Sequence, residues 1–335
     1  MIDMIKKKFT FVILTYNHED FVCDHLNSIK YQITSFGIGM SFDLIIADDN
    51  STDKTQCIID QWIIKNKSLF NRIKLLYNQQ RRGTCYNFSN AIKNVQTEIF
   101  NCLDGDDLYT WNNIFPIFDY FDNYDVVYTP ILKFKDLVSG WNKNSFYTSL
   151  ADVKFYEYNK AKWSKYYVSP PFSCGHFFKK SLFTESLLSF IEKFDLIEDR
   201  AMWIKLFEEN PSLKIKLLNN FQILYRVNNS SVMHTINSDI RIAYSFDSIK
   251  QHKFVYDLVT NKKIMRFHFR RATRELKNIF KLRRPRTNLI NIFIHKIQVY
   301  TFVISNRKIT SKMKLNSFNA EYNNFIAFIK EQTDV

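Results

Sequence analysis

Glycine, proline and cysteine are scarce in this sequence. Six Gly and six Pro in 335 residues argue against long flexible linkers and against intrinsic disorder. The cysteines are odd in number and scattered, and no pair has CxxC spacing: Cys23, Cys57, Cys85, Cys102 and Cys174. This pattern predicts neither a disulfide framework nor a zinc site, and it is typical of a reducing compartment.

Long apolar runs are also lacking. The run 9–14 follows a basic N-terminus, but it is too short for a secretory signal and ends in polar residues. The stretch 288–304 is only 17 residues long and is interrupted by polar and charged side chains, so it is marginal for a membrane span. We therefore expect a cytoplasmic protein without transmembrane helices, and the lack of multiple spans argues against a processive synthase.

Aromatic and aliphatic side chains are abundant instead. The sequence contains 32 Phe and 18 Tyr, and its 46% hydrophobic and 24% charged residues are ordinary for a globular protein. A chain of 335 residues therefore has enough material for the core of one large domain or of two medium domains.

The net charge of +14 belongs to one segment. Residues 251–315 hold 17 Lys and Arg against Asp257 and Glu275, whereas the rest of the chain holds 30 basic and 31 acidic residues. The basic residues alternate with Phe, Leu and Ile, as in helices that lie on an anionic membrane surface. Nucleic-acid binding is a weaker alternative, because no RNA- or DNA-binding module is recognisable. A basic face packed on an acidic partner subunit is a third.

Strand-like and helix-like stretches alternate along the first third of the chain. Runs rich in β-branched and aromatic residues predict strands at 9–14, 42–47, 73–77 and 98–103. Helical patterns follow the first three, at 20–31, 54–65 and 84–94. This alternation implies βαβ units and a mainly parallel sheet. In such sheets, ligands bind beyond the carboxyl ends of the strands.

An acidic turn follows the fourth predicted strand and precedes a helix-like segment that starts near Trp111. Asp104, Asp106 and Asp107 lie within four residues, and carboxylates this close repel one another unless water or a cation lies between them. Proteins hold Mg²⁺ and Mn²⁺ through one or two carboxylates together with phosphate oxygens. The turn is a candidate metal–phosphate site. The alternative is a solvated turn, because Asp and Gly are common turn residues.

Two further polar clusters fall at predicted strand ends. Residues 15–17 (Thr-Tyr-Asn) end the first strand, and residues 48–53 end the second. The second cluster has the composition of a helix N-terminus, so capping by Ser51 or Asp53 is the alternative to ligand binding. Three clusters that are distant in sequence thus fall on one predicted sheet edge, which favours a binding site there.

Together these residues resemble family 2 glycosyltransferases with the GT-A fold. The resemblance covers residues 9–232 and rests on motifs in consistent order: Thr15-Tyr16-Asn17, Asp48-Asp49-Asn50-Ser51-Thr52-Asp53, Asn87, Asp104-Gly105-Asp106-Asp107, Glu198-Asp199 with Trp203, and Tyr225-Arg226. It implies an α/β fold with a mainly parallel, Rossmann-like sheet flanked by helices. We predict a GT-A catalytic domain at 1–232 and a helical, basic region at 233–335. Residues 131–178 match no motif.

The resemblance also implies a role for each cluster. A UDP-sugar donor would be bound by nine residues: Thr15, Tyr16, Asn17, Asp48, Asp49, Arg82, Asp104, Asp106 and Arg226. Asp106 and Asp107 would hold Mn²⁺ or Mg²⁺. Arg81 and Arg82 have the alternative of a solvated basic pair, and Arg226 that of a structural salt bridge.

A separate acidic pair, Glu198-Asp199, opens a helix that follows an apolar helix at 182–194. Acids in a first turn are favoured by the helix dipole, which lowers the pKa of an acid and keeps it ionised. Ordinary N-terminal charge placement is therefore one reading. By resemblance, Asp199, with Glu198 beside it, is the general base that takes the proton of the acceptor hydroxyl.

The leading hypothesis is an inverting, metal-dependent glycosyltransferase that uses a UDP-sugar. Its acceptor would be a glycan or lipid-linked oligosaccharide of capsule, O-antigen or lipooligosaccharide synthesis, at the inner face of the cytoplasmic membrane, without nucleic acid. One alternative is a non-catalytic membrane-surface binding protein on a degenerate transferase fold. The other, a nucleotidyltransferase, would need a Gly-rich phosphate loop near the first strand, and residues 15–20 contain no Gly.

Overall fold

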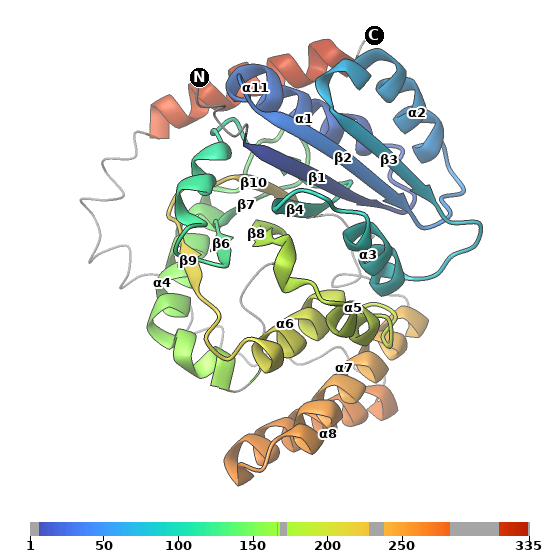
Figure 1. Ribbon diagram of the computed structural model, residues 1–335, viewed down its shortest axis with the longest axis vertical. Coiled ribbons are helices and arrows are strands. Elements are labelled where there is room, and N and C mark those ends of the chain that lie inside the picture. Colours follow the sequence, from blue (N-terminus) through green and yellow to red (C-terminus); the bar gives the residue numbers. More distant parts are fainter. Residues whose placement is uncertain (1–6, 166, 168–172, 228–237, 282–314, 334–335) are drawn as a thin grey trace, which may run out of the picture.

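A seven-stranded sheet forms the centre of the computed structural model, which describes residues 7–165, 167, 173–227, 238–281 and 315–333 (Figure 1). The strand order is β3-β2-β1-β4-β8-β6-β9. The strands are β1 (Lys8–Thr15), β2 (Ser41–Asp48), β3 (Arg72–Tyr77), β4 (Ile99–Asp104), β6 (Val126–Tyr128), β8 (His176–Lys179) and β9 (Ile215–Leu217). Within this sheet only β8 runs antiparallel to its neighbours, so the predicted mainly parallel α/β sheet is confirmed.

Helices cover both faces of the sheet, which explains why its central strands are apolar throughout. Seven of the eight residues of β1, and seven of the eight of β2, are buried. A parallel strand between two helical layers needs apolar side chains at every position, not at every second one. On one face the strands pack against α1 (Val22–Phe36) and α2 (Thr55–Asn66). On the other they pack against α3 (Thr84–Lys93), α5 (Glu185–Ile191) and α6 (Glu198–Glu209).

Two predicted helices differ from the observed elements. The segment after Trp111 forms the short strand β5 (Leu108–Tyr109) and then a 3₁₀ helix, η2 (Phe115–Tyr120), with a proline near its start. The predicted helix at 182–194 is divided into η4 (Lys180–Leu182) and α5. The division falls at Thr184, whose hydroxyl accepts the Leu187 N–H at 3.0 Å and so caps a new helix. An apolar pattern alone does not reveal such a cap.

The segment 131–178, which matched no motif, contributes to a second sheet. The order of this sheet is β5-β10-β7, with β7 at Ile131–Phe134 and β10 at Ile223–Arg226. The long helix α4 (Lys143–Lys165) follows β7 and packs against it. Strand β5 follows the acidic turn at 104–107 directly, and β10 pairs with β5. The second sheet thus brings β10 next to the acidic turn.

The described helices after residue 232 pack on the sheet domain. The helices α7 (Ser238–Leu258) and α8 (Lys262–Lys281) form a hairpin beside α6, and Val255 and Ile264 belong to the same apolar cluster as α3, α5 and α6. The helix α11 (Leu315–Thr333) lies along α1 (Figure 1). None of these described helices is long and apolar enough to cross a membrane. The stretch 288–304 lies outside the described residues.

The contact between α11 and α1 is aromatic. The ring of Phe325 is fully buried and lies 5.0 Å from the ring of Tyr31, centroid to centroid, and 6.2 Å from that of Trp111. Lys30 donates to the Gln332 side chain at 2.6 Å. We therefore propose that α11 folds as part of the catalytic domain, although it follows the predicted boundary at 232.

Replacing this anchor tests that proposal. We expect Phe325→Ala to lower the free energy of unfolding of the whole domain by about 3–5 kcal/mol, the usual cost of truncating a buried Phe. Asn324→Ala, on the exposed side of the same helix, should change it by less than about 0.5 kcal/mol. Denaturant unfolding followed by tryptophan fluorescence measures both. An unchanged midpoint for Phe325→Ala would show that α11 is not part of the cooperative unit.

Candidate active site

The parallel register aligns the ends of neighbouring strands. Thr15 at the end of β1 lies opposite Asp48 at the end of β2, and Leu14 lies opposite Asp104 at the end of β4. The backbone pairing continues past the strands, because the Asp49 N–H donates to the Thr15 carbonyl at 3.0 Å. The three polar clusters predicted for one sheet edge are therefore adjacent.

Asp48 is the centre of hydrogen bonding at this edge. Its buried carboxylate accepts four hydrogen bonds: from the Thr15 hydroxyl at 2.7 Å, the Ser51 N–H at 2.8 Å, the Ser51 hydroxyl at 2.5 Å and the Gln56 amide at 2.6 Å. The protein itself therefore satisfies both oxygens of this buried carboxylate. Asp48 and Thr15 thus join the ends of β1 and β2.

The loops that follow β1 and β2 are locked together. Asn17 and Asn50 have left-handed backbones, with φ of 53° and 63°, a conformation that Asn tolerates better than most residues. The Asn17 side-chain oxygen accepts the Thr52 N–H at 2.9 Å. Asp53, not Ser51, contacts the start of α2, by accepting the Thr55 N–H at 2.9 Å.

Asp49 holds the loop between β3 and α3. Its carboxylate accepts the Arg82 N–H at 2.7 Å, the Gly83 N–H at 2.9 Å and the Asn78 amide at 3.0 Å. The two arginines of this loop stack on tyrosines: the guanidinium of Arg81 lies 4.3 Å from the ring centre of Tyr16, and that of Arg82 lies 4.0 Å from Tyr86. Both arginines are exposed. The loop thus presents two cations on aromatic faces beside the strand ends.

A glycine is required inside the acidic turn. The Gly105 N–H donates to the Leu14 carbonyl at 2.8 Å, which holds the turn against the end of β1. A Cβ at this position would lie 2.8 Å from the Thr15 methyl group and 3.0 Å from the His18 ring. The sequence Asp104-Gly105-Asp106 therefore reflects close packing of the turn on β1.

The three carboxylates of the turn have different surroundings. Asp104 is exposed to solvent, yet desolvation by the protein around it, followed by the charges of Asp106 and Asp199, raises its pKa to about 7. Asp106 is half-buried. Asp107 is 1% exposed, and burial together with the charges of Asp106 and Asp104 raises its pKa well above the ordinary value. Of the two predicted metal ligands, only Asp106 has a side chain that solvent reaches.

Arg226 stabilises the acidic turn through two hydrogen bonds. Its N–H donates to the Asp107 carboxylate at 2.8 Å, and its Nε donates to the Asp106 carbonyl at 2.8 Å. The guanidinium is 3.5 Å from the carboxylate of Asp24 and is sandwiched between two phenylalanine rings, those of Phe21 and Phe134. The alternative of a structural salt bridge is thus present in the structure. Arg226 is only 4% exposed, so it affects the site by holding the acidic turn in place.

The predicted acid pair opens α6 and lies within electrostatic range of the turn. The charge of Asp199 acts on Asp104, and the charges of Asp199 and Asp104 both act on Glu198. Burial and then these two like charges raise the pKa of Glu198 well above its ordinary value. The expectation that the helix dipole would lower the pKa is therefore wrong for Glu198, because burial and like-charge repulsion outweigh the dipole here.

The donor set at the edge fits a divalent cation. No three His, Cys, Asp or Glu side chains among the described residues form a complete metal cage by themselves. Mg²⁺ and Mn²⁺, however, commonly take one or two carboxylates and complete their shell with water and substrate phosphate. Asp104 and Asp106 offer two such carboxylates. Desolvation first, and then the charges of Asp106 and Asp199, raise the pKa of Asp104, and a divalent cation would relieve the repulsion between the carboxylates.

Two residues of this edge have no local sequence signal. Asn78 donates to Asp49 and also to the Asn87 side chain, at 3.3 Å, so it connects two of the motif residues. The ring of His18 packs on the acidic turn, and desolvation lowers its pKa although the charges of Asp106 and Asp53 oppose this. Only the tertiary contacts identify either residue.

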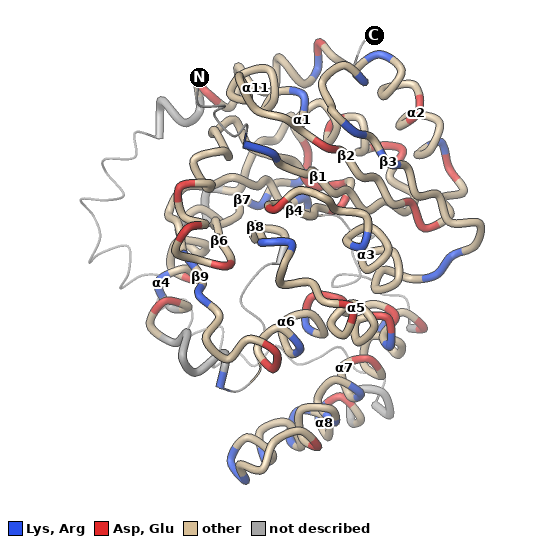
Figure 2. The backbone as a smooth tube through the Cα atoms, in the orientation of Figure 1, with Lys and Arg blue, Asp and Glu red and all other residues tan. Residues whose placement is uncertain are grey.

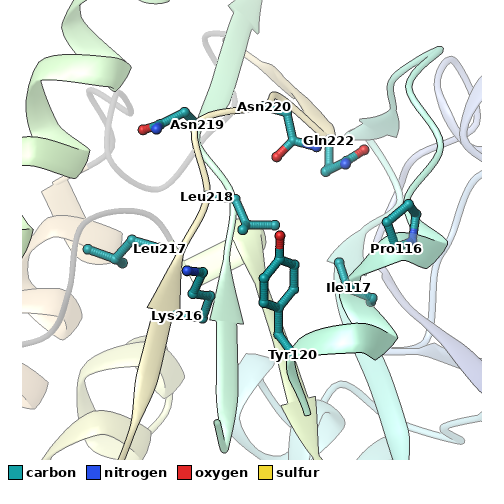
Figure 3. Close-up of a pocket in the computed structure, with 9 residues that line it drawn as sticks. All are labelled: Pro116, Ile117, Tyr120, Lys216, Leu217, Leu218, Asn219, Asn220 and Gln222. Carbon is teal, nitrogen blue, oxygen red and sulfur yellow. The ribbon is translucent and has the colours of Figure 1, made fainter. Parts of the chain in front are cut away.

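A pocket of about 480 Å³ lies elsewhere, between η2 and the segment from β9 to β10 (Figure 3). Tyr120 and Ile117 line one side, and Leu218 and Asn220 the other. None of its lining residues is a predicted site residue. The candidate active site is therefore defined by the strand ends and not by this pocket.

Parallel strands that end in acidic clusters at one sheet edge define an α/β protein with a candidate binding site at that edge. A family model described as "Glycosyl transferase family 2" matches residues 10–185, which is more than half of the chain. The chain belongs to glycosyl transferase family 2, and it is a glycosyltransferase with the GT-A fold.

Curated relatives match parts of this sequence, and a solved structure matches its fold. The teichoic acid poly(glycerol phosphate) polymerase of Staphylococcus epidermidis is 31% identical over 127 residues, which is 38% of this chain and 16% of that protein. An uncharacterized protein of Mycobacterium tuberculosis is 31% identical over 99 residues, 30% of this chain and 27% of that protein. The chain thus matches less than a third of the length of these curated relatives. The crystal structure of residues 1–349 of S. aureus TarS has a TM-score of 0.55 at 16% identity, over 98% of this chain and 91% of that chain.

The close packing of the acidic turn is testable at Gly105. We expect Gly105→Ala to lower stability by about 1–3 kcal/mol, as overpacked sites do, and to reduce transferase turnover at least tenfold by displacing Asp104 and Asp106. The control is Gly39→Ala, at a position where a Cβ meets nothing within 4 Å; it should lose stability through its positive φ but keep turnover. Thermal unfolding and donor turnover are the measurements. Unchanged turnover in Gly105→Ala would contradict this account of the turn.

Proposed function

We propose that this protein is an inverting, metal-dependent glycosyltransferase that uses a UDP-sugar donor. The observation that carries the proposal is the meeting of two acidic groups, the turn at 104–107 and the pair Glu198-Asp199, at the sheet edge where β1 and β2 also end. Sugar transfer from a nucleoside diphosphate needs both: acids that hold the cation of the leaving group, and an acid that takes a proton.

For the donor, we infer that the nucleoside lies over the loops that follow β1, β2 and β3. Tyr16 and Asn17 supply an aromatic ring and an amide, and Asp49 orders the loop that carries Arg82. Thr15 and Asp48 have their polar groups committed to each other, so they shape the pocket floor. The cations of Arg81 and Arg82 are exposed beside it and suit the negative charge of a diphosphate.

For the metal, we propose Asp106 and Asp104 as the protein ligands of Mn²⁺ or Mg²⁺. Bound there with the diphosphate, the ion would offset the charge that develops on the leaving UDP. Asp107 is buried and accepts the Arg226 N–H, so it holds the turn in shape from inside. Arg226 fixes the Asp106 backbone through its own Nε and thereby orients the ligand.

For the proton transfer, we propose Asp199 as the general base. Its carboxylate accepts a proton from the acceptor hydroxyl while the hydroxyl oxygen attacks the anomeric carbon and the bond from that carbon to the UDP oxygen breaks. Attack from the face opposite the leaving group inverts the configuration at that carbon. We propose Asp199 rather than Glu198 because burial and the charges of Asp199 and Asp104 raise the pKa of Glu198, which makes Glu198 harder to ionise than an ordinary glutamic acid.

For the acceptor, we infer a cell-surface glycopolymer. The sequence match to a teichoic acid polymerase favours a polymer of the teichoic acid type over capsule, O-antigen or lipooligosaccharide. A lipid-linked acceptor would lie at the inner face of the cytoplasmic membrane, where we place the protein as a peripheral component.

The hairpin of α7 and α8 has the surface that such attachment needs. Lys and Arg recur along α8 (Figure 2). Its exposed cations include Lys262, Lys263, Arg266, Arg270 and Arg274. Phe269 is 62% exposed between them, and Leu276 is 41% exposed. Basic side chains around exposed apolar ones are typical of a helix that rests on an anionic bilayer.

The catalytic assignment is tested by two variants. We expect Asp199→Asn to lower kcat by about 100-fold or more while UDP affinity is kept, because only the proton acceptor is lost. Asp106→Asn should weaken Mn²⁺-dependent UDP binding about tenfold or more, because a carboxylate ligand is lost. Asp122→Asn, at an exposed position of the described surface, is the matched control. Donor turnover and calorimetry with UDP and Mn²⁺ are the measurements.

Three outcomes would reject parts of this proposal. Full turnover in Asp199→Asn would remove the general base. Wild-type UDP binding in the absence of any divalent ion would remove the metal. No UDP binding by the wild-type protein, together with retained vesicle binding, would favour the non-catalytic membrane-surface alternative.

Membrane attachment is tested by charge reversal on α8. We expect Arg266→Glu with Arg270→Glu to weaken binding to vesicles that contain anionic lipid by at least about 30-fold, because each lost basic residue contributes about 1 kcal/mol near such a surface and the new carboxylates are repelled by it. The double variant Lys67→Glu with Lys74→Glu has the same net charge, at exposed positions far from α8 in sequence, and should bind as the wild type does. Co-sedimentation with anionic and with neutral vesicles measures both. Equal losses in the two double variants would argue against a site on α8.

A further inference from the structure

We propose that Asp247 on α7 is a positioning residue for the acid pair Glu198-Asp199. The inference rests on the proposed function, in which Asp199 is the general base. Helix α6 begins without a side-chain cap of its own, because its N-cap residue is Ile197. The N–H groups of Asp195 and Leu196, which precede this helix, are bound by a residue of another element.

Asp247 supplies those partners from another helix. A single carboxylate oxygen, Oδ2, accepts the Asp195 N–H at 2.8 Å and the Leu196 N–H at 2.7 Å. The side chain of Asp247 is fully buried, and the other oxygen lies 3.6 Å from the Lys250 ammonium group. Burying a carboxylate is costly unless it is hydrogen-bonded; here Oδ2 has two N–H donors, whereas Oδ1 is buried without a hydrogen-bond partner among the described residues, beside the Lys250 charge.

Neighbouring residues of α7 extend the same contact. The Gln251 amide donates to the Ile197 carbonyl at 2.9 Å. Beyond the acid pair, Arg200 donates to the Ser248 hydroxyl at 2.6 Å and to the Tyr244 hydroxyl at 3.4 Å. Residues 244, 247, 248 and 251 follow helical spacing, so they lie on one face of α7. This face therefore holds the chain on both sides of Glu198 and Asp199.

The start of α3 and the glycine before it contact the same segment. The Cys85 N–H donates to the Asp195 carbonyl at 3.4 Å, and a Cβ on Gly83 would lie 2.9 Å from that carbonyl oxygen. Gly83 has a φ of +87°, and its N–H is bound by Asp49. The segment 195–197 thus lies between the loop proposed to bind the nucleotide and the helix α7. Its position sets that of the acid pair relative to the donor.

The proposed positioning residue, Asp247, lies outside the part of the chain that the family model matches. The family model ends at residue 185 and the predicted catalytic domain at residue 232, whereas Asp247 lies beyond both. The hydrogen bonds that Asp247 accepts come from main-chain N–H groups, so it acts on the reaction through the placement of other residues.

The test uses the full-length protein with Asp247→Ala and Asp247→Asn. An asparagine oxygen can accept both N–H groups as the single Asp247 oxygen does, whereas alanine accepts neither. We expect Asp247→Ala to lower kcat by about 10- to 100-fold, as small misplacements of catalytic groups do. The KM for the donor and the Kd for UDP with Mn²⁺ should stay within about twofold, and Asp247→Asn should restore kcat to within about threefold of the wild type.

Turnover is expressed per UDP-binding site counted by calorimetry, so that unfolded protein is not scored as slow enzyme. Ser245→Ala is the matched control on α7, because its hydroxyl faces Glu275 of α8 and not the acid pair. It should keep the wild-type kcat. If Asp247→Ala does not fold, Gln251→Met removes the contact to Ile197 alone and should lower kcat at least threefold with UDP affinity unchanged.

The outcomes separate this inference from the proposed function. If Asp199→Asn turns over at the wild-type rate, the proposed function fails and Asp247 has no base to position. If Asp199→Asn is inactive but Asp247→Ala keeps the wild-type kcat, only the positioning role fails. The role also fails if Asp247→Asn is as slow as Asp247→Ala, because the loss would then follow charge and not hydrogen bonding.

Discussion

The parallel register of β1 with β2 and β4 is the constraint on which the candidate site depends. Each strand contributes a polar end, and parallel pairing places Thr15, Asp48 and Asp104 at one edge. The hydrogen bonds of Asp48 then fix the relative positions of the two loops that follow β1 and β2. A one-residue slip would turn these side chains into the helical layers, where an unpaired carboxylate is costly.

Several carboxylates lie at this edge, and their surroundings differ from one residue to the next. Desolvation and like charges raise the pKa of Asp104, Asp107 and Glu198. The carboxylates of Asp48 and Asp49 accept hydrogen bonds from the loops around them. A cation that binds beside Asp104 would reverse part of this shift, because it favours the ionised form. Metal binding and deprotonation of Asp104 are therefore expected to be linked.

The C-terminal helices contribute to the glycosyltransferase fold in two ways. The buried aromatic contacts of α11 fill the face of α1 that would otherwise lie open, and α7 contacts the segment from which the acid pair starts. The same hairpin carries the basic outer surface of α8. A surface proposed for membrane contact and a helix proposed to position the general base are thus parts of one packed unit.

The sequence by itself determined the sheet and the location of its functional edge. Runs of strand length at 9–14 and 42–47, rich in apolar residues, predict strands buried on both faces, and the polar residues directly after them then lie at the carboxyl ends. The sequence did not predict the division of the helix at 182–194 or the 3₁₀ helix after Trp111. The cap at Thr184 and the proline at the start of η2 override the apolar periodicity there. Only the tertiary structure decided which acids face water, that Arg226 lies beneath the turn, and that Asp247 reaches the start of α6. These depend on burial and on contacts between residues far apart in the chain, and local sequence carries no record of either.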